Sequence, residues 1–270
     1  MNFFVKRLIN SFNYHWHSPR INWRKTIFFN LMTLPFKDAI KLPVVIYGPC
    51  SIGSTMGHIK LLSTAHFGML KIGPSDPVRS RHSKSYISVA GVLEIDEDTT
   101  LRKGIHLQIR DSGILRLCKS AYIGDNNTII AECLIEIGHS VRVGNNTTFM
   151  DTDFHYIINT KTREVKYNKK PIAIGENCWI GGWCTIKKGT KLPKGTIVAG
   201  PYAMTSKDYT DKIAECSLIA GSPAKVIVEG MRRINNGQSD IEIVKFYKEN
   251  KGVFVLQQDK NLDDFCMPNK

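Results

Sequence analysis

One segment of the sequence, Asp151-Thr152-Asp153-Phe154-His155, brings an imidazole and two carboxylates together. A histidine can take a proton from a hydroxyl near neutral pH, and a carboxylate on its other ring nitrogen would fix the tautomer and stabilise the cation. The segment therefore predicts general-base chemistry with His155 as the base. Asp153 is the first choice as orienting group, with Asp151 or a backbone carbonyl as alternatives. The competing interpretation is a surface histidine beside two solvated acids.

Other residue types that often carry chemistry show no comparable arrangement. The remaining histidines share no metal-ligand spacing, so no metal site is predicted; they are His15, His17, His58, His66, His82, His106 and His139. The seven cysteines show neither ligand spacing nor a paired framework. They read as buried thiols of a reducing compartment, which predicts a cytoplasmic protein. Cys178 and Cys184 are expected to pack inside the fold rather than act as nucleophiles.

The candidate site lies beside a repeat with a period of six residues. Large apolar residues recur at Ile174, Ile180, Ile186, Leu192, Val198 and Met204. Neither a helix nor an alternating strand has this period. A hexad repeat is typical of a parallel β-helix, in which three short strands form one coil and aliphatic side chains point into a shared interior. The sequence thus predicts a mainly β fold.

The repeat extends toward the N-terminus and is interrupted once. Earlier hexad positions are Ile46, Ile52, Leu117, Ile123 and Ile129, followed by a two-residue reset to Ile137, Val143 and Phe149. The rhythm stops over 155–171, which is rich in Lys, Asn and Thr, and resumes at Ile172. A polar insertion between regular coils predicts a projecting loop, a frequent carrier of function. We therefore expect a β-helix domain over 43–228 with an inserted loop at 155–171.

Helical segments are predicted at both ends. Residues 1–42 form a basic segment with one apolar face at Phe4, Leu8 and Phe12, and a second helix after Ser18-Pro19 that presents Trp23, Ile27, Leu31 and Leu34 and ends before Pro35. Covering an exposed strand edge is the favoured role for these helices, and lying on a membrane is the alternative. Residues 229–270 form a helical tail. Its helix should start at Asp240, with Ser239 and Glu242 as a capping box and Ile241, Val244 and either Tyr247 or Lys248 on one side.

Charge and composition bound the classes of function. The 270 residues carry a formal net charge of +13, and the first 41 include seven basic residues and one acidic residue. No apolar run approaches the roughly 18 residues that span a bilayer, and the N-terminal residues make a poor signal peptide. The basic N-terminus could contact anionic lipid at the inner face of the membrane. No aromatic-rich basic face or binding motif points to nucleic acid.

Several motifs together resemble the hexapeptide-repeat acyltransferases. They are the hexads, the segment that ends at His155, Cys178-Trp179-Ile180-Gly181-Gly182, and Gly221-Ser222-Pro223-Ala224-Lys225. The resemblance covers about 117–227 and is nearest to the bacterial polysaccharide O-acetyltransferases, close to the maltose and galactoside acetyltransferases. It implies a left-handed parallel β-helix, a homotrimer with active sites between subunits, acetyl-CoA as donor, and His155 as base.

The resemblance also implies a set of coenzyme-binding residues. Trp179, Gly181 and Gly182 would lie beside the pantetheine arm, and Gly200 would let the thioester approach the backbone. Lys207 and Lys225 would meet the nucleotide phosphates. The chain departs from the family pattern at Met204-Thr205-Ser206-Lys207-Asp208, which is one residue longer, and at Pro201-Tyr202, where relatives carry small residues.

Three functions remain open from the sequence. The first is acetyl-CoA-dependent O-acetylation of a sugar hydroxyl in bacterial surface polysaccharide biosynthesis, by direct transfer. The second is N-acetylation of an amino sugar on a nucleotide carrier, which also needs a base because an amine must lose a proton. The third is a β-helix that serves as a scaffold without chemistry. His155 at the edge of an inserted loop favours an enzyme, since a scaffold would not need it.

Overall fold

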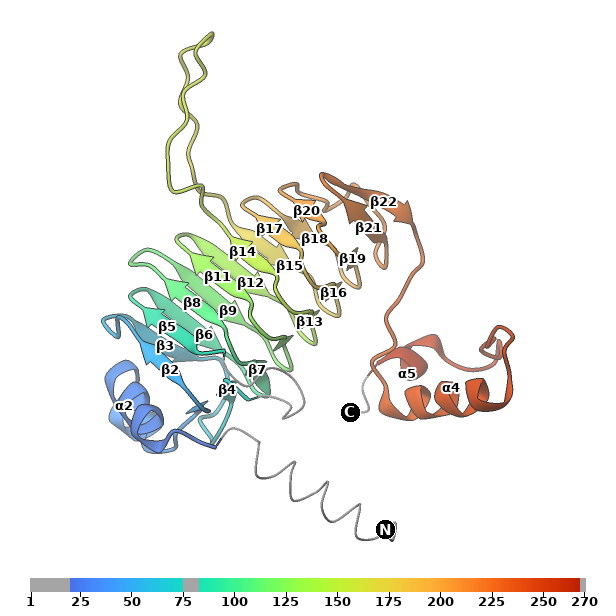
Figure 1. Ribbon diagram of the computed structural model, residues 1–270, viewed down its shortest axis with the longest axis horizontal. Helices are drawn as coiled ribbons and strands as arrows, with labels where there is room; N and C mark the ends of the chain where they lie inside the picture. The colour runs from blue at the N-terminus through green and yellow to red at the C-terminus, as the bar shows by residue number, and fades with distance from the viewer. Residues whose placement is uncertain (1–19, 75–82, 268–270) are drawn as a thin grey trace, which may run out of the picture.

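The chain winds through three parallel β-sheets as a β-helix (Figure 1). The computed structural model describes residues 20–74 and 83–267. From β1 to β20, strands three positions apart in the chain pair with one another, so one coil contributes one strand to each sheet; at the C-terminal end β19 pairs with β21 instead. This register confirms the predicted β-helix of hexapeptide repeats, because six-residue spacing allows one short strand and one turn per prism face.

The strands of the three sheets have the following bounds. The first sheet contains β1 (Val44–Ile46), β4 (Leu70–Ile72), β7 (Thr99–Leu101), β10 (Tyr122–Ile123), β13 (Arg142–Val143), β16 (Trp179–Ile180), β19 (Ile197–Ala199), β21 (Leu218–Gly221) and β22 (Ala224–Val228). The second contains β2 (Cys50–Ile52), β5 (Ser85–Val89), β8 (His106–Ile109), β11 (Thr128–Ala131), β14 (Thr148–Met150), β17 (Thr185–Lys187) and β20 (Met204–Thr205). The third contains β3 (His58–Leu61), β6 (Val92–Ile95), β9 (Ile114–Leu117), β12 (Leu134–Ile137), β15 (Ile172–Ile174) and β18 (Lys191–Leu192).

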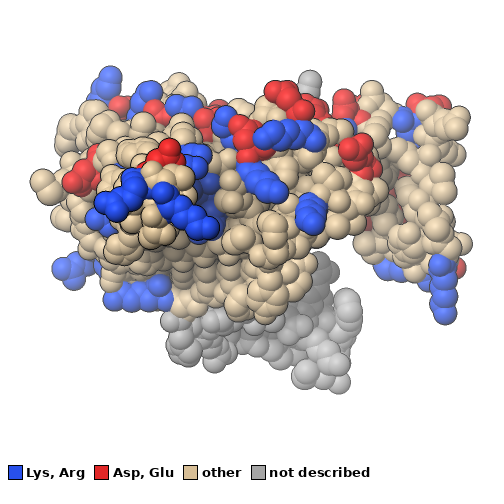
Figure 2. Space-filling model, turned by 90° about the horizontal axis from the view of Figure 1, so that it is seen from above, with Lys and Arg blue, Asp and Glu red and all other residues tan. Residues whose placement is uncertain are grey.

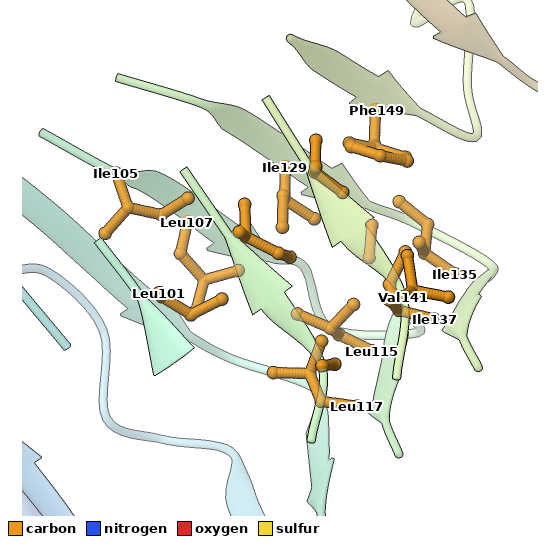
Figure 3. Packing of buried hydrophobic residues seen from close by; sticks show 14 of the residues in the cluster. Leu101, Ile105, Leu107, Leu115, Leu117, Ile129, Ile135, Ile137, Val141 and Phe149 are labelled. Atoms are coloured by element: carbon orange, nitrogen blue, oxygen red, sulfur yellow. The ribbon is translucent and has the colours of Figure 1, made fainter. Parts of the chain in front are cut away.

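The core is the interior of the prism, where aliphatic side chains from all three sheets meet (Figure 3). The predicted inward residues from Leu117 to Val198 are buried. The two-residue reset has a simple cause: β12 is four residues long and points both Ile135 and Ile137 inward. Longer strands of this kind keep the coils stacked while they change the spacing along the chain.

The last predicted hexad position is wrong. In β20 the inward residue is Thr205, which pairs with Ile186, whereas Met204 pairs with Thr185 and is partly exposed. Val198 pairs with Ile180 and Met204 pairs with Thr185, yet six positions separate Val198 from Met204 and only five separate Ile180 from Thr185. Because side chains alternate along a strand, one extra residue moves the opposite set inward. The extra residue therefore lies before Met204, not after it.

Helix α2 (Trp23–Thr33) covers the edge of β1, which confirms the predicted capping role for this helix. The Asn30 side chain donates to the Val44 carbonyl at 2.7 Å and accepts from the Val44 N–H at 3.1 Å. Thr26 Oγ1 accepts from the Ile46 N–H at 3.0 Å. These side chains replace the backbone partners that a further strand would supply.

The predicted buried face of α2 is wrong, because the helix packs on the hydrogen-bonding edge of β1. Three of its four residues, Trp23, Ile27 and Leu31, are about half exposed, and only Leu34 is buried. The face on the coils carries Thr26, Phe29, Asn30 and Thr33 instead, because a strand edge needs polar partners. The helix begins at Trp23 with Asn22 as its cap and ends before Pro35 as expected. The Phe4–Leu8–Phe12 face and Ser18-Pro19 lie outside the described residues.

The C-terminal region closes the coils and continues into helices. The predicted single closing strand is an antiparallel hairpin of β21 and β22. Helix α4 (Gly237–Glu249) begins three residues earlier than predicted, and its cap is Asn236, whose side chain accepts from the N–H groups of Gln238 and Ser239. Ser239 is therefore inside the helix and the predicted capping box is wrong. Helix α5 (Leu262–Cys266) follows α4. At the other end of the chain, the short helix α3 (Phe36–Ala39) follows α2.

Charged side chains of both signs lie beside one another on the face shown in Figure 2. On the third sheet an ordered row alternates in sign, with Arg116 bonded to Glu94 at 2.5 Å and to Glu136 at 2.9 Å. Much of the positive charge is thus balanced locally. Among the described residues, no helix combines the length and apolarity that crossing a bilayer requires.

Candidate active site

The predicted loop is an extended arm that leaves the prism after β14 and returns at β15 (Figure 1). Antiparallel bridges join Thr152 to Lys169 and Ile158 to Val165, so its two limbs run side by side. Side chains from Phe154 to Tyr167 are exposed, including large apolar ones. The arm projects from the corner between the second and third sheets, and His155 lies at its base.

Asp151 is a structural acceptor at this corner. Its carboxylate is fully buried and accepts the backbone N–H groups of Glu132 and Cys133, each at 2.8 Å. Burial raises the pKa of Asp151, and the backbone hydrogen bonds oppose that rise. The carboxylate therefore ties the arm's first residue to the preceding coil, and both of its oxygens accept backbone N–H groups there.

Glu132 extends the support under the arm. Its carboxylate receives Arg110 Nε at 2.9 Å and Lys169 Nζ at 3.1 Å, and the Thr152 hydroxyl at 3.3 Å. The Thr152 hydroxyl in turn accepts the Phe154 N–H at 3.0 Å. Both limbs of the arm are thus bonded to one acidic side chain of the previous coil, which holds the base of the arm in place.

Asp153 and His155 are neighbours at the mouth of the site. The Asp153 carboxylate pairs with Lys188 Nζ at 2.5 Å and with Lys187 Nζ at 3.7 Å. The His155 backbone N–H donates to the Asp153 carbonyl at 2.7 Å. Its imidazole is exposed, and no hydrogen bond to it is formed by the described part of the chain. Asp153 is therefore held by lysines here, while the His155 ring is free to meet a ligand.

A cavity of about 390 Å³ opens between the limbs of the arm and β17. Its lining residues are Asp153, His155, Ile157, Ile158, Asn159, Glu164, Lys166, Asn168 and Lys188. Asn168 is 5% exposed, and its Oδ1 is one of the buried polar atoms in the described chain that lack a hydrogen-bond partner. The cavity thus combines an exposed imidazole, cationic Lys188 and a vacant acceptor, which suits a ligand with hydroxyl groups.

Lys188 and Asn168 were missed at the sequence level, although a signal for Lys188 exists. Ile186 pairs with Phe149, so Lys188 follows Ile186 as Asp151 follows Phe149. Aligning successive coils places Lys187 and Lys188 next to the segment that ends at His155. Asn168 offers no such signal, because the length of the arm hides where its returning limb meets the coils.

The expected coenzyme residues of the first sheet share one side of the prism. Trp179 lies on β16 and is 44% exposed. A Cβ on Gly181 would lie 2.5 Å from the Gly200 nitrogen, and one on Gly200 would lie 2.2 Å from the Gly182 oxygen. The three glycines therefore let successive coils approach closely, and they leave the backbone open on their outer side. Lys225 is exposed on β22 of the same sheet.

These coenzyme candidates and His155 lie at different corners of the prism. Gly181 and Gly182 lie in one turn from the first to the second sheet and Gly200 lies in the same turn of the next coil, whereas the arm leaves between the second and third sheets. Lys207 follows β20, and its carbonyl accepts the Lys191 N–H at 3.1 Å, so it lies on the arm's side. One chain brings His155, Asp153 and Lys207 to one corner and Trp179, the glycines and Lys225 to another.

The thiols do not contribute to this arrangement. Cys178 and Cys184 are buried at inward positions. Burial raises the pKa of Cys178 to about 12, and it also raises the pKa of Cys184. A thiol held protonated is a poor nucleophile. No group of three or more His, Cys, Asp or Glu side chains in the described residues is arranged to hold a metal ion.

Comparisons with known proteins point to acetyltransferases. A probable acetyltransferase of Mycobacterium tuberculosis is 25% identical over 161 residues, which cover 59% of this chain and 50% of that protein. The galactoside O-acetyltransferase of Lactococcus lactis is 29% identical over 116 residues, which cover 43% of this chain and 51% of that protein. The chain is similar to the hexapeptide-repeat acetyltransferases.

The chain spans about half the length of the curated relatives it matches. Among solved structures, a polysialic acid O-acetyltransferase aligns with 80% of this chain and 99% of its own, at 20% identity and a TM-score of 0.45. No family model matches the sequence.

Proposed function

We propose that the protein is an acetyl-CoA-dependent O-acetyltransferase that acts on a sugar hydroxyl, with His155 as general base. The observation that carries the proposal is the exposed imidazole of His155 at the base of the arm, in a cavity that also presents Lys188 and Asn168. The sequence similarity to two acetyltransferases supports the reaction class.

The donor acetyl-CoA would bind along the first sheet, whose exposed residues suit the parts of this molecule. Trp179 offers an exposed aromatic face, and Gly182 and Gly200 leave backbone atoms accessible where a side chain would block them. Lys225 on the same sheet and Lys207 at the arm's corner are exposed cations that suit phosphate groups. Acetyl-CoA supplies the acetyl group as a thioester.

The mechanism is direct transfer. His155 accepts the proton of the sugar hydroxyl as that oxygen attacks the acetyl carbonyl carbon. A backbone N–H stabilises the negative charge on the carbonyl oxygen, and the sulfur leaves as the carbon–sulfur bond breaks. The proton on His155 is then available to the thiolate. Lys188 holds Asp153 beside the base and keeps the carboxylate at the mouth of the cavity.

We propose that the working unit is a homotrimer with active sites between subunits. The two sets of site residues lie at different corners of one prism, so a neighbouring chain is needed to bring them together. The arm exposes Tyr156, Ile157 and Tyr167 by 63–72%, and a partner's surface would cover these side chains. Light scattering should give three times the mass of one chain, and a stable monomer would contradict the shared site.

We further propose a setting in bacterial surface polysaccharide biosynthesis at the inner face of the membrane. The outer side of α2 exposes Trp23, Ile27 and Leu31, and Arg24 is an exposed cation on the same helix. Aromatic and basic side chains on one helix suit an anionic lipid surface. Salt-sensitive binding to acidic vesicles, and not to neutral ones, would be expected.

The proposal is tested by replacing His155. His155→Ala should reduce acetyl transfer by about 10² to 10⁴-fold, with an unchanged thermal midpoint because the ring is exposed. His139→Ala is the matched control, since His139 is an exposed histidine at another coil corner. Mass spectrometry with acetyl-CoA and a panel of neutral, acidic and amino sugars would identify the acceptor and separate O- from N-acetylation. Transfer at the normal rate by His155→Ala would remove the base from the mechanism.

A further inference from the structure

Two arginine side chains meet on the outer surface of the first sheet, away from the arm. Arg142 lies on β13, and its Nη1 donates to the carbonyls of Ser120 and Val141. Arg233 lies in the segment between β22 and α4, and its Nη2 donates to the Ser140 carbonyl at 3.2 Å. Since Ser140 and Val141 are adjacent in the chain, the two guanidinium groups are anchored to neighbouring carbonyls.

Neither guanidinium has an acidic partner within ion-pair distance among the described residues. Elsewhere on the coils arginines are paired, as Arg102 is with Asp125 at 2.7 Å. Burial lowers the pKa of Arg142. Burial, and next the positive charge of Arg142, lower the pKa of Arg233 to about 10, although Asp240 opposes this. Two half-buried cations that repel one another are costly unless an anion compensates them.

Unmade hydrogen bonds gather at the same place. Arg233 Nε and Asn235 Nδ2 are buried donors without a partner in the described chain. Asn235 Oδ1 accepts Arg233 Nη1 at 3.0 Å, so the amide is directed by the guanidinium. One buried acceptor nearby is also unpaired, Asn177 Oδ1 in the next coil corner, so the two unpaired donors outnumber it. An excess of donors around two positive charges matches an oxyanion, which only accepts hydrogen bonds.

Aromatic side chains flank the arginines along the sheet. The Tyr122 ring centroid lies 5.6 Å from Arg142 Cζ. On the other side, Arg142 is in register with Trp179, whose indole is 44% exposed. A planar or ring-shaped group attached to the anion would therefore find an aromatic surface directly beside the charged site.

We propose that Arg142 and Arg233 form an oxyanion-binding site, with Asn235 as a further donor and Trp179 as the adjoining wall. The ligand is a phosphate or carboxylate carried on a ring-bearing molecule. Two sources share this chemistry: the nucleotide phosphates of the donor and the carboxylate of an acidic acceptor sugar. The choice between these sources rests on the proposed function, whereas the presence of the site does not.

Titration calorimetry on the full chain tests the site without requiring activity. The probes are adenosine 3′,5′-bisphosphate against adenosine, and glucuronate against glucose. We expect one charged probe to bind and its neutral counterpart to bind at least tenfold more weakly. Preference for the bisphosphate would assign the site to the donor, and preference for glucuronate to an acidic acceptor. Equal behaviour of charged and neutral probes, or no binding by either charged probe, would overturn the inference.

Substitutions then locate the binding. Arg142→Gln and Arg233→Gln should each weaken the preferred charged probe at least tenfold. Lys119→Gln removes the same charge nearby from a residue that is paired with Glu97 at 3.4 Å, and it should change affinity less than twofold. An equal effect of Lys119→Gln would indicate general charge attraction and overturn the site. His155→Ala should bind the probe normally, so that a failure of catalysis and a failure of this site give different results.

Discussion

Asp151→Asn tests whether the first carboxylate of the candidate segment supports the fold or the base. In the wild-type protein its two oxygens accept the N–H groups of Glu132 and Cys133 at 2.8 Å in a fully buried position. An amide offers one acceptor oxygen, and its NH₂ group faces the second N–H. Two buried donors are then unpaired, at about 1–3 kcal/mol each. Loss of the buried charge offsets part of this cost, so we expect a loss of about 2–4 kcal/mol in the free energy of unfolding.

The assay is urea denaturation followed by circular dichroism, at one protein concentration for all variants. Asp153→Asn is the control, because its carboxylate is 24% exposed and pairs with Lys188 near solvent; it should cost less than about 1 kcal/mol. An Asp151→Asn protein of wild-type stability but with greatly reduced transfer would refute the structural role. Asp151 would then be a candidate for the group that orients His155.

The pH dependence gives a second check on Asp151. Burial raises its pKa above the ordinary 3.8 in the folded state, so the folded protein binds this proton more tightly than the unfolded chain. The contribution of this group to stability is therefore present at low pH and is lost as pH rises through the raised value. The stability difference between wild type and Asp151→Asn should shrink over that range. A difference that grew with pH would contradict the direction of the shift.

Three further predictions concern the scaffold. Gly200→Ala should destabilise the coils by several kcal/mol or shift the adjacent turn, because its Cβ would lie 2.2 Å from the Gly182 oxygen; a thermal midpoint equal to wild type would contradict the close packing. Asn30→Ala should lower the free energy of unfolding by about 2–4 kcal/mol because it leaves Val44 backbone groups unpaired, whereas Ile27→Ser should lower it by less than about 0.5 kcal/mol. If urea denaturation gave the reverse order, Ile27 and not Asn30 would belong to the buried face of α2. Cys178, whose burial raises its pKa to about 12, should react with iodoacetamide at pH 8 only after unfolding, and rapid native-state alkylation would disprove its inert role.

Helix α2 turns its apolar stripe toward solvent. Trp23, Ile27 and Leu31 are spaced as a buried stripe, yet α2 turns them outward. A stripe is expected inside when the surface to be covered is apolar. The surface here is the open edge of β1, whose backbone groups need hydrogen bonds, so Thr26 and Asn30 face it instead. The sequence contains that polar face too, but nothing local says that the neighbour is a strand edge.

What the sequence by itself determined is the coil and the segment that bears His155. Hexad spacing is a local property of short strands and turns, so the interior residues and the position of the arm could be read directly. One extra residue before Met204 was enough to turn Met204 outward and Thr205 inward, because side chains alternate in a strand.

Tertiary structure alone decided which side chains surround the candidate base. Stacking of coils brings Lys188 to Asp153 and the Glu132 and Cys133 amides to Asp151, so the two carboxylates have different environments and different roles. The turn-back of the arm brings in Asn168, and the C-terminal segment brings Arg233 to Ser140. These contacts join residues that are far apart in the chain. Their distances depend on how coils and arms fold against one another, which no local spacing encodes.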